Sequence, residues 1–300
     1  MSGRVRAALA PPAFPYVPGM DVCGEVVALG AGVAGLATGD CVVATNADRN
    51  VVGGLAEYIE VQARDAVRKP PEVDPLTAAA AVTSSATALH AVRVSARVRP
   101  GDRVLVLGGS GGVGSMAVQL AKVDGAALVV ATSTQGELVR ALGADRVIDY
   151  RECDWSADPA YQAERFDVVI DCVGGGRHYT LARRVLKSRW RGGRFVAVAG
   201  DNPKPVATTV CQLLGMVLGM LRRPVVTFFC PWLPRYTMPV TTASARAMQT
   251  ILDLLVAGRV RVPLEPAGPF DFTRAGVVDA LQRLGSGHAH GKIVVRIAEQ

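Results

Sequence analysis

A run of glycines in the middle of the chain has a spacing that suits phosphate binding. Residues 109–114 read Gly-Ser-Gly-Gly-Val-Gly and satisfy the pattern G-x-G-x-x-G. The run follows a short apolar segment, residues 103–107, and opens an amphipathic one, residues 113–123, so it lies between a predicted strand and a predicted helix. Glycines in that context permit a tight turn and let a pyrophosphate approach the amides of a helix N-terminus. We predict a dinucleotide site; the alternative is a tight turn that binds nothing.

The end of the next predicted strand bears on which dinucleotide binds. Residues 131–135 read Ala-Thr-Ser-Thr-Gln, and no acidic residue follows until Glu137. An NAD site usually has an acid here to hydrogen-bond the ribose hydroxyls, whereas hydroxyl donors such as Thr132 and Ser133 can contact a 2′-phosphate. This favours NADPH, although the usual Arg or Lys for the phosphate is missing. Alternatively, the hydroxyls only cap the helix that begins near Glu137.

The elements that position these residues alternate between strand and helix. Such alternation is typical of a parallel sheet covered on both faces, the doubly wound α/β architecture. We predict strands at residues 103–107, 127–131, 146–148, 167–170, 194–198 and 225–229, and helices at 113–123, 137–142 and 179–187.

The two ends of the chain have a different pattern. Residues 19–62 are rich in Val, Gly and turn pairs, which indicates short antiparallel strands of a barrel or sandwich. After residue 238 we expect a helix at 243–257 and a last strand at 292–297. We therefore predict one discontinuous domain from residues 1–89 and 238–300, with a dinucleotide-binding domain, residues 90–237, inserted between its parts.

Composition narrows the class of protein. Of 300 residues, 50% are hydrophobic and 20% charged, which excludes a disordered or collagenous chain. The six cysteines include no C-x-x-C pair and predict reduced thiols. The net charge is +7, but the basic residues are dispersed and only 5% of residues are aromatic, so we expect no nucleic acid partner. The charge reflects a solvated surface or a field that attracts an anionic ligand.

Residues 206–221 form a long apolar stretch that contains Gly215-x-x-x-Gly219. Sixteen residues with Thr208, Thr209 and Gln212 among them are fewer than the roughly 20 that span a bilayer. We predict a buried or interface helix and no membrane span.

Several short motifs together resemble the medium-chain dehydrogenase/reductase superfamily. Its zinc-independent quinone oxidoreductase branch fits best, in particular the mitochondrial NADPH oxidoreductases of that branch. The resemblance implies a GroES-like β-barrel domain and a Rossmann domain, with NADPH in the cleft between them. Besides the glycine run, the motifs are Pro18-Gly19-Met20-Asp21-Val22-Cys23-Gly24, Gly39-Asp40-Cys41-Val42, Gly54-Leu55-Ala56-Glu57-Tyr58, Leu142-Gly143-Ala144-Asp145, Asp171-Cys172-Val173-Gly174, and, for the branch, Gly136–Arg140, Phe228-Phe229 and Gly287–Lys292.

The same resemblance implies the residues that contact the cofactor. Read without it, Tyr150 is a strand-end aromatic, Cys172 a small buried residue and the two histidines ordinary loop residues. The implied contacts are Ser110, Gly111, Gly112 and Val113 to the pyrophosphate, Thr132, Ser133 and Tyr150 to the adenosine phosphate end, Cys172 and Val198 to the nicotinamide side, and Thr87, Phe229 and His288-Ala289-His290 as a cover from the other domain.

The sequence departs from the superfamily at two places. Zinc-dependent members have Gly-His-Glu where this chain has Gly19-Met20-Asp21, and their four-cysteine lobe is absent, so we expect no zinc. Members also carry several tens of residues before the Pro-Gly-x-Asp motif, whereas here Pro18 follows Met1 closely. We therefore expect an N-terminally incomplete barrel with an unpaired edge.

These features predict a zinc-independent NADPH-dependent reductase that transfers hydride to a small-molecule quinone or enone. In such chemistry the cofactor supplies the reactive bond, and we assign no catalytic residue. Two alternatives stay open, a 2-enoyl-thioester reductase that acts on acyl-CoA or acyl carrier protein, and an inactive NADPH-binding scaffold. We expect a cytoplasmic homodimer, with a mitochondrial location as the alternative.

Overall fold

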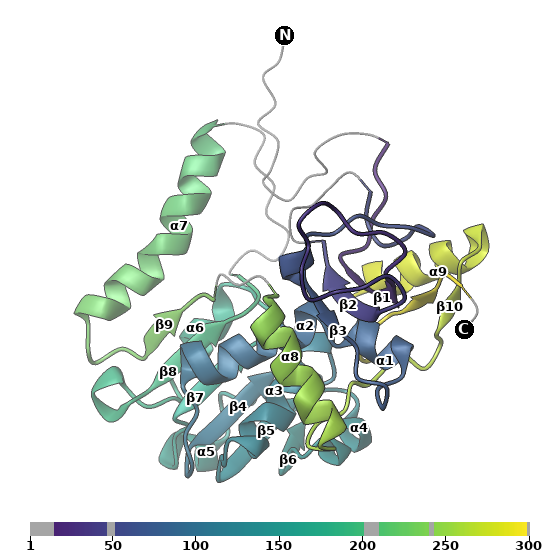
Figure 1. The fold of residues 1–300 in the computed structure, drawn as a ribbon. Coiled ribbons are helices and arrows are strands. Elements are labelled where there is room, and N and C mark those ends of the chain that lie inside the picture. Colours follow the sequence, from purple (N-terminus) through teal and green to yellow (C-terminus); the bar gives the residue numbers. More distant parts are fainter. Residues whose placement is uncertain (1–14, 47–51, 201–209, 240–242, 299–300) are drawn as a thin grey trace. The chain divides into compact units, whose positions relative to one another are not determined.

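The chain divides into two compact units. The sheet unit takes the described residues among 90–110 and 117–240, and the terminal unit takes those among 11–89, 111–116 and 241–300. Figure 1 colours the elements along the sequence. The computed structural model describes residues 15–46, 52–200, 210–239 and 243–298, with only the backbone described at 210–217 and 220.

The sheet unit is built on six parallel strands in the order β6-β5-β4-β7-β8-β9 (Figure 1). The chain begins in the middle of the sheet at β4, adds strands outward to β6, and then crosses to β7 and continues to β9. This reversal confirms the predicted doubly wound sheet, in which ligands bind beyond the carboxyl ends of the central strands. The strands are β4 Arg103–Leu107, β5 Leu128–Thr132, β6 Arg146–Ile148, β7 Val168–Asp171, β8 Arg194–Ala197 and β9 Arg235–Thr237.

Helices connect these strands, mostly where the sequence predicts them. The helix predicted at 179–187 is shorter, because the backbone of Val185 and Lys187 pairs with Phe166 before β7 instead of continuing the helix. The helices are α3 Gly112–Val123, α4 Gly136–Ala141, α5 Pro159–Ala163, α6 Arg177–Ala182 and α7 Val210–Phe229, with the short helices η2 His90–Ala96 and η3 Arg189–Arg191.

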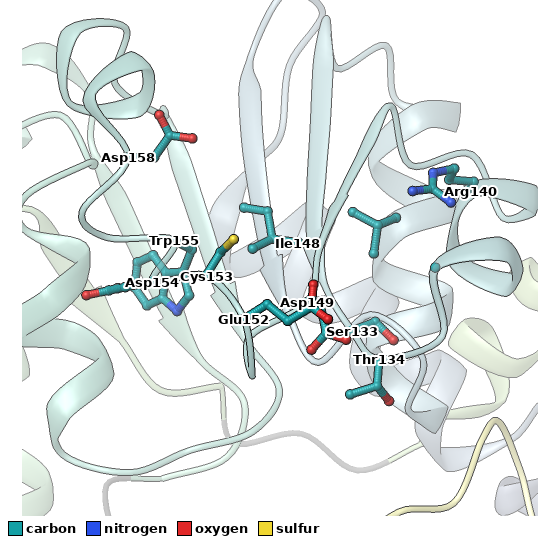
Figure 2. Close-up of a pocket in the computed structure, with 12 residues that line it drawn as sticks. Ser133, Thr134, Arg140, Ile148, Asp149, Glu152, Cys153, Asp154, Trp155 and Asp158 are labelled. Carbon is teal, nitrogen blue, oxygen red and sulfur yellow. The ribbon is translucent and has the colours of Figure 1, made fainter.

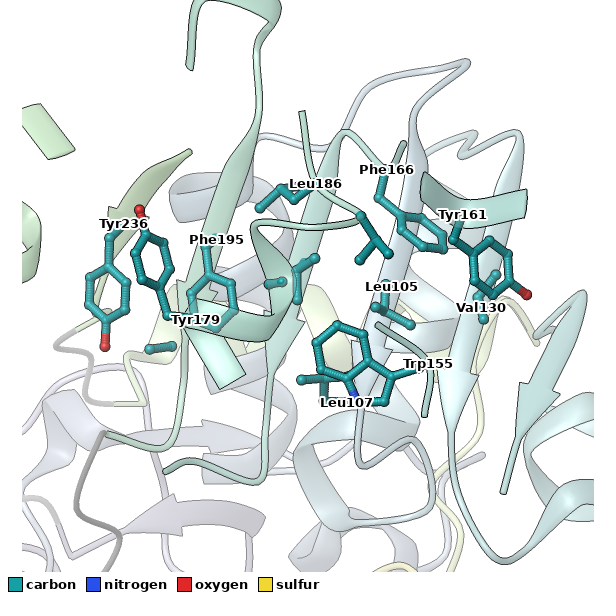
Figure 3. Packing of buried hydrophobic residues seen from close by; sticks show 14 residues of the cluster. Leu105, Leu107, Val130, Trp155, Tyr161, Phe166, Tyr179, Leu186, Phe195 and Tyr236 are labelled. Carbon is teal, nitrogen blue, oxygen red and sulfur yellow. The ribbon is translucent and has the colours of Figure 1, made fainter. Parts of the chain in front are cut away.

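Aromatic side chains fill the core of the sheet unit and fasten its last strand (Figure 3). Tyr236 of β9 stacks on Phe195 of β8 with ring centroids 5.5 Å apart, and it meets Tyr179 of α6 edge to face at 5.2 Å. The Tyr179 hydroxyl donates to the carbonyl of Pro234 (2.9 Å). Offset and edge-to-face pairs each add about 0.5–1.5 kcal/mol beyond burial, so these contacts hold a three-residue edge strand in place.

Residues 225–229 were wrongly predicted as the sixth strand, because they form the end of α7. Their burial has a helical period: Thr227 is 1% exposed, whereas Val225, Val226, Phe228 and Phe229 are exposed. The Thr227 hydroxyl donates to the carbonyl of Arg223 (2.9 Å), one helical turn back, and accepts from the Tyr236 amide (3.1 Å). Within the described part of the chain, no helix is both long and apolar enough to cross a bilayer.

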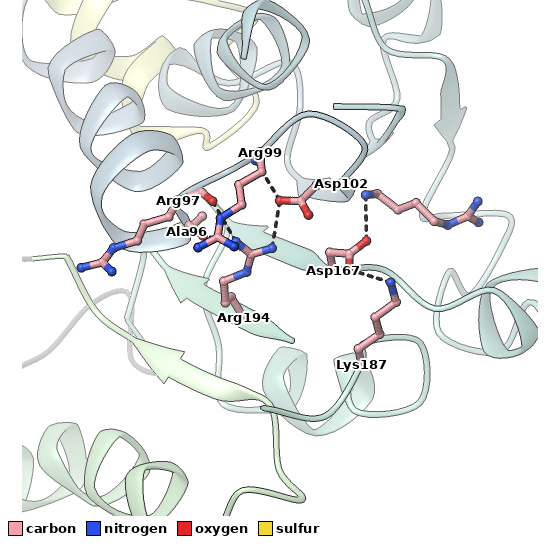
Figure 4. Close-up of polar contacts among 8 residues, drawn as sticks. Ala96, Arg97, Arg99, Asp102, Asp167, Lys187 and Arg194 are labelled. Atoms are coloured by element: carbon pink, nitrogen blue, oxygen red, sulfur yellow. Dashed lines mark hydrogen bonds and ion pairs between the residues drawn. The ribbon is translucent and has the colours of Figure 1, made fainter. Parts of the chain in front are cut away.

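Charged side chains tie the strand ends of the sheet unit together (Figure 4). The Arg194 guanidinium donates to the carboxylate of Asp102 (2.8 Å) and to the carbonyls of Ala96 and Arg97 (both 2.8 Å). These bonds join β8 to the end of η2. Because Arg194 and Asp102 are only 18% and 13% exposed, removing one partner would leave the other charge poorly solvated.

The terminal unit combines an antiparallel sheet with helices from both ends of the chain. The sheet has the order β1-β2-β3 and is antiparallel. Its first two strands lie within residues 19–62, where antiparallel strands were predicted, and β3 lies just beyond that range. Val43, Val82, Ala86, Met248 and Leu252 form its core. The elements are β1 Asp21–Glu25, β2 Cys41–Thr45, η1 Ala63–Asp65, β3 Ala66–Arg68, α1 Pro75–Ala80, α2 Thr83–Leu89, α8 Ala245–Val256, β10 Phe270–Asp271, α9 Arg274–Gly285 and β11 Val295–Arg296.

The strand predicted at 292–297 is shorter than expected. Only β11, Val295–Arg296, pairs regularly, parallel to β10. Lys292 instead bridges to Leu264: its amide donates to the carbonyl of Pro263 (2.9 Å), and its carbonyl accepts from the amide of Glu265 (2.9 Å). This bridge fixes the backbone from which the Lys292 side chain extends.

Candidate cofactor site

The glycine turn joins β4 to α3, and Thr132 at the end of β5 holds its start. The Gly108 amide donates to the Thr132 hydroxyl (3.0 Å), and the Gly109 amide donates to the Thr132 carbonyl (2.9 Å). A Cβ atom on Gly109 would lie 2.8 Å from the Cβ of Ala131. Glycine is therefore required here for close packing of the turn on the sheet.

Lys292 lies beside the first residue of α3. A Cβ atom on Gly112 would lie 2.9 Å from Cδ of Lys292 and 3.2 Å from the hydroxyl oxygen of Ser84. The Lys292 ammonium donates to that hydroxyl (2.8 Å) and is 3.9 Å from the carboxylate of Asp21. The first amides of a helix lack intrahelical partners and carry partial positive charge. The Lys292 ammonium adds a full positive charge beside them, and the two together suit a bound anion. Sequence reasoning missed Lys292 as a site residue.

The residues at the position of the superfamily's catalytic zinc do not fit a zinc ion. The carboxylate of Asp21 accepts from both the amide (3.0 Å) and the hydroxyl of Thr83, so both its oxygens have partners. Met20 offers a thioether, which is a poor zinc ligand. Among the described residues, no three His, Cys, Asp or Glu side chains gather as a metal site. Zinc independence stays a prediction, which rests on this donor chemistry.

A cavity of about 400 Å³ lies beyond β5 and β6 in the sheet unit (Figure 2). Ser133, Thr134 and Arg140 are among the residues that line it, and Figure 2 shows Ser133 and Thr134 next to each other with Arg140 farther along the lining. Arg140 folds back along α4: a Cβ atom on Gly136 would lie 3.2 Å from Nη1 of its guanidinium. Arg140 is exposed and has no ion pair with any residue that the structure describes.

Four acids line this cavity, and three of them, Asp149, Asp154 and Asp158, are held by neighbouring groups, whereas Glu152 is exposed. Asp149 pairs with Arg151, whose hydrogen bonds lower the pKa of the carboxyl to about 2. Asp154 accepts from the amide and hydroxyl of Ser156, which lowers its pKa, and Asp158 caps α5. Asp154 and Asp158 line the side of the cavity away from Arg140 (Figure 2). The cavity therefore combines one guanidinium and two hydroxyls with several carboxylates, and Asp149 and Glu152 lie close to Ser133 and Thr134 (Figure 2).

Asp171 organises the loop at the carboxyl end of β7. It is 2% exposed and accepts from the amides of Val173 (3.0 Å) and Gly174 (2.9 Å), and its Oδ2 lies 3.0 Å from Nδ1 of His178. That hydrogen bond raises the pKa of His178. The Asp171 carbonyl accepts from the amide of Val198 (2.9 Å). These bonds bring Cys172 and Val198, both predicted for the nicotinamide side, to adjacent strand ends.

Cys172 has the properties of a packing residue. Its amide donates to the carbonyl of Leu107 (3.1 Å), which ties the loop to β4. Burial raises the pKa of its thiol above the usual range, and the nearby Asp171 acts in the same direction. At neutral pH the side chain is therefore a neutral thiol and a poor nucleophile.

The other predicted residues lie at separate places. In the sheet unit, Tyr150 is exposed just after β6, while Phe229 is 73% exposed at the end of α7, beside β9 at the opposite sheet edge. In the terminal unit, the Thr87 hydroxyl donates to the carbonyl of Thr83 (2.8 Å), and the His290 amide donates to the carboxylate of Glu265 (2.7 Å). His288 and Ala289 follow α9 in the same loop.

Family models match both units of the chain. A model described as a zinc-binding dehydrogenase matches residues 142–295, and one described as an alcohol dehydrogenase GroES-like domain matches residues 1–71. The first covers more than half of the chain.

Individual proteins are similar over nearly the whole chain. It is 34% identical to the 2-methylene-furan-3-one reductase of Solanum lycopersicum, over 98% of this chain and 66% of that protein. It is 33% identical to the mitochondrial NAD(P)H oxidoreductase RTN4IP1 of Danio rerio, over 95% of this chain and 73% of that protein. The chain thus spans about two thirds of the length of these relatives.

A solved structure gives the same fold. The quinone oxidoreductase from Coxiella burnetii superposes with a TM-score of 0.74 at 27% sequence identity, over 95% of this chain and 80% of that one. The likeness includes the sheet unit and the terminal unit, as the predicted Rossmann and GroES-like domains require. Together, the glycine turn, the strand order, the two family models and these relatives establish that the chain belongs to the medium-chain dehydrogenase/reductase superfamily.

Proposed function

We propose that this chain is a zinc-independent NADPH-dependent reductase that transfers hydride to a quinone or an enone. Relatives named 2-methylene-furan-3-one reductase, NADPH-dependent alkenal/one oxidoreductase and quinone oxidoreductase support this acceptor class. These acceptors share a carbon–carbon double bond or ring conjugated to a carbonyl, which makes them electron-poor.

The observation that carries the proposal is the glycine turn with Lys292 at the start of α3. Gly112 lies beside the Lys292 side chain, whose ammonium is held by Ser84. The helix N-terminus and the ammonium together suit the two negative charges of a pyrophosphate. Ser110, Gly111 and Val113 would contribute backbone amides to the same group, since they flank Gly112 in the turn.

The preference for NADPH rests on the hydroxyls and the guanidinium among the residues that line the cavity. Ser133 and Thr134 offer hydroxyl donors, and Arg140 offers a guanidinium whose fork geometry matches a phosphate. The Thr132 hydroxyl accepts a hydrogen bond from the Gly108 amide. It could therefore still donate one hydrogen bond to a phosphate oxygen. Arg140 would therefore bind the 2′-phosphate in place of the Arg or Lys that is missing directly after β5.

NADPH, when bound, supplies a hydride from C4 of its nicotinamide ring. The chain's own residues position that ring through Cys172 and Val198, at the ends of β7 and β8. The buried Asp171 fixes both positions through its hydrogen bonds. A neutral Cys172 thiol packs without competing as a nucleophile for an electron-poor acceptor. The proton that completes the reduction comes from solvent or from a group that we leave unassigned.

The test combines a binding titration with turnover. NADPH and NADH are titrated against the protein by cofactor fluorescence, and oxidation is then followed with a panel of quinones, an enone and crotonyl-CoA. The proposal requires NADPH to bind at least tenfold more tightly than NADH and to be oxidised by a quinone or the enone. Oxidation only by crotonyl-CoA would identify an enoyl-thioester reductase. Binding without oxidation by any acceptor would identify an inactive scaffold.

A further inference from the structure

Residues 290–292, which we call the Lys292 segment, contact the glycine turn through their backbone. Gly291 forms an isolated parallel bridge with Gly111 of the turn. On its other side, Gly291 packs so closely that a Cβ atom there would collide with the carbonyl oxygen of Pro263, and its φ of +87° also favours glycine. The path of this segment therefore sets where the Lys292 side chain starts.

One buried carboxylate joins the Lys292 segment to α9. Glu265 is 3% exposed. Its Oε2 accepts from the amide of His290 (2.7 Å), and its Oε1 lies 3.0 Å from Nη2 of Arg283, near the end of α9. The Glu265 amide also donates to the carbonyl of Lys292 (2.9 Å). Glu265 thus holds the Lys292 segment at both of its ends.

The carboxylate of Glu265 is charged at neutral pH. Burial alone would raise its pKa, but the hydrogen bonds from Arg283 and from the His290 amide outweigh burial, so the pKa is lowered. A buried ion pair adds little net stability, because apolar residues of similar volume are often as good or better. The consequence of the Glu265–Arg283 pair is therefore its geometry more than its contribution to the free energy of unfolding.

We infer that Glu265 is a positioning residue of the cofactor site, which places the Lys292 ammonium beside the start of α3 by fixing the backbone of His290. The inference rests on the proposed function, since it requires Lys292 to contact the pyrophosphate. From this backbone the ammonium reaches the Ser84 hydroxyl (2.8 Å). Binding groups must be held to a fraction of an ångström, and a misplacement of about 1 Å can cost roughly a hundredfold. Arg283 acts through Glu265 by fixing its carboxylate.

Two double variants test this role, because they differ only in the group that faces the His290 amide. Glu265→Gln with Arg283→Met keeps an oxygen that can accept from that amide. Glu265→Met with Arg283→Met keeps no acceptor. Both variants remove the two buried charges together, so neither strands one of them, and both should fold.

The hydrogen bond to His290 should decide the affinity for NADPH. By fluorescence titration, we expect the dissociation constant to stay within about threefold in the glutamine variant and to rise at least about tenfold in the methionine variant. The KM for NADPH should follow, with kcat unchanged, because Lys292 would hold the phosphates equally in the ground state and the transition state.

Hydrogen–deuterium exchange gives a second readout that needs no cofactor. The His290 amide loses its acceptor only in the methionine variant, so the peptide that covers residues 286–292 should exchange faster in that variant alone. The matched control is Arg194→Met with Asp102→Leu, which removes a partly buried ion pair from the sheet unit. It should leave both the exchange of residues 286–292 and the affinity for NADPH unchanged.

Three results would overturn the inference. One is equal affinity for NADPH in the two Glu265 variants, and another is equal exchange of residues 286–292 in them. The third is a loss of affinity in the Arg194 control as large as in the methionine variant, which would show that overall stability controls binding. If the unmodified chain binds no NADPH, the proposed function itself fails and this inference fails with it.

Discussion

Replacing Gly112 with aspartate should abolish NADPH binding while leaving the fold intact. The new Cβ atom would lie 2.9 Å from Cδ of Lys292 and 3.2 Å from the Ser84 hydroxyl. Both neighbours are ends of side chains rather than backbone, so they can move aside at a cost of about 1–3 kcal/mol. The new carboxylate would also lie near the Lys292 ammonium and would neutralise it. We therefore expect Gly112→Asp to fold.

Binding of NADPH should nevertheless collapse in this variant. A carboxylate about 4 Å from a phosphate costs roughly 4 kcal/mol at an effective dielectric constant near 20. Since 1.4 kcal/mol is a factor of ten, the dissociation constant should rise by at least a hundredfold even if the charges separate somewhat. Fluorescence titration measures this constant, and circular dichroism confirms the fold.

Two further glycine variants serve as controls. One tests the added side-chain volume at Gly112 without the charge, and the other tests a different glycine of the same turn. Gly112→Ala adds the volume without the charge, so it should weaken binding about tenfold or less. Gly109→Ala puts a methyl group 2.8 Å from the Cβ of Ala131 in the packed sheet, and should lower the free energy of unfolding by about 1–3 kcal/mol. If Gly112→Asp binds NADPH as tightly as the unmodified chain, the turn does not hold the pyrophosphate and the reasoning fails.

Other residues give independent tests. Arg140→Glu should weaken NADPH binding at least tenfold and leave NADH binding within a factor of about two, because the guanidinium would contact only the 2′-phosphate. Titrations with both cofactors measure this, with Arg146→Glu as the matched control. An equal loss for both cofactors would refute the assignment. His178 has a pKa raised above 6.5 by its bond to Asp171, so its stabilisation is complete below 6.5 and declines as pH rises through the raised value. Urea unfolding should therefore show His178→Asn to be destabilised by roughly 1.5–3 kcal/mol near about pH 6 and by much less near about pH 9; equal losses at both would contradict the linkage. Arg194→Met should lower the free energy of unfolding by about 3 kcal/mol by stranding Asp102, and recovery in the double variant with Asp102→Leu would separate this cause from lost packing.

The central sheet and its glycine turn could be predicted because their signals are local. Buried parallel strands such as β4 and β5 are short apolar runs, and the turn residues follow β4 directly. Residues 225–229 have the same apolar composition but lie on a helix. They were predicted as a strand because composition alone does not reveal that only Thr227 is buried. An apolar run whose side chains face solvent can therefore be mistaken for a buried strand when only the sequence is read.

Three site residues, Ser84, Lys292 and Arg140, were missed, for two different physical reasons. Ser84 and Lys292 are 208 residues apart, and only the folded terminal unit brings them to Gly112. Arg140 could have been found, because side chains on a helix lean toward its N-terminus and residues four apart share a face, which directs Arg140 back to Gly136.

The central claim is hydride transfer from NADPH, and isotope transfer tests it most directly. The chain is incubated with NADPH deuterated at C4 of the nicotinamide and with an enone, and the product is analysed by mass spectrometry. We predict a reduced product that carries one deuterium from one of the two C4 positions, at a rate lowered in Gly112→Asp in step with its cofactor affinity. Cofactor that stays unconsumed across the enone and the quinones, or a product that carries no label from either position, would contradict the assignment.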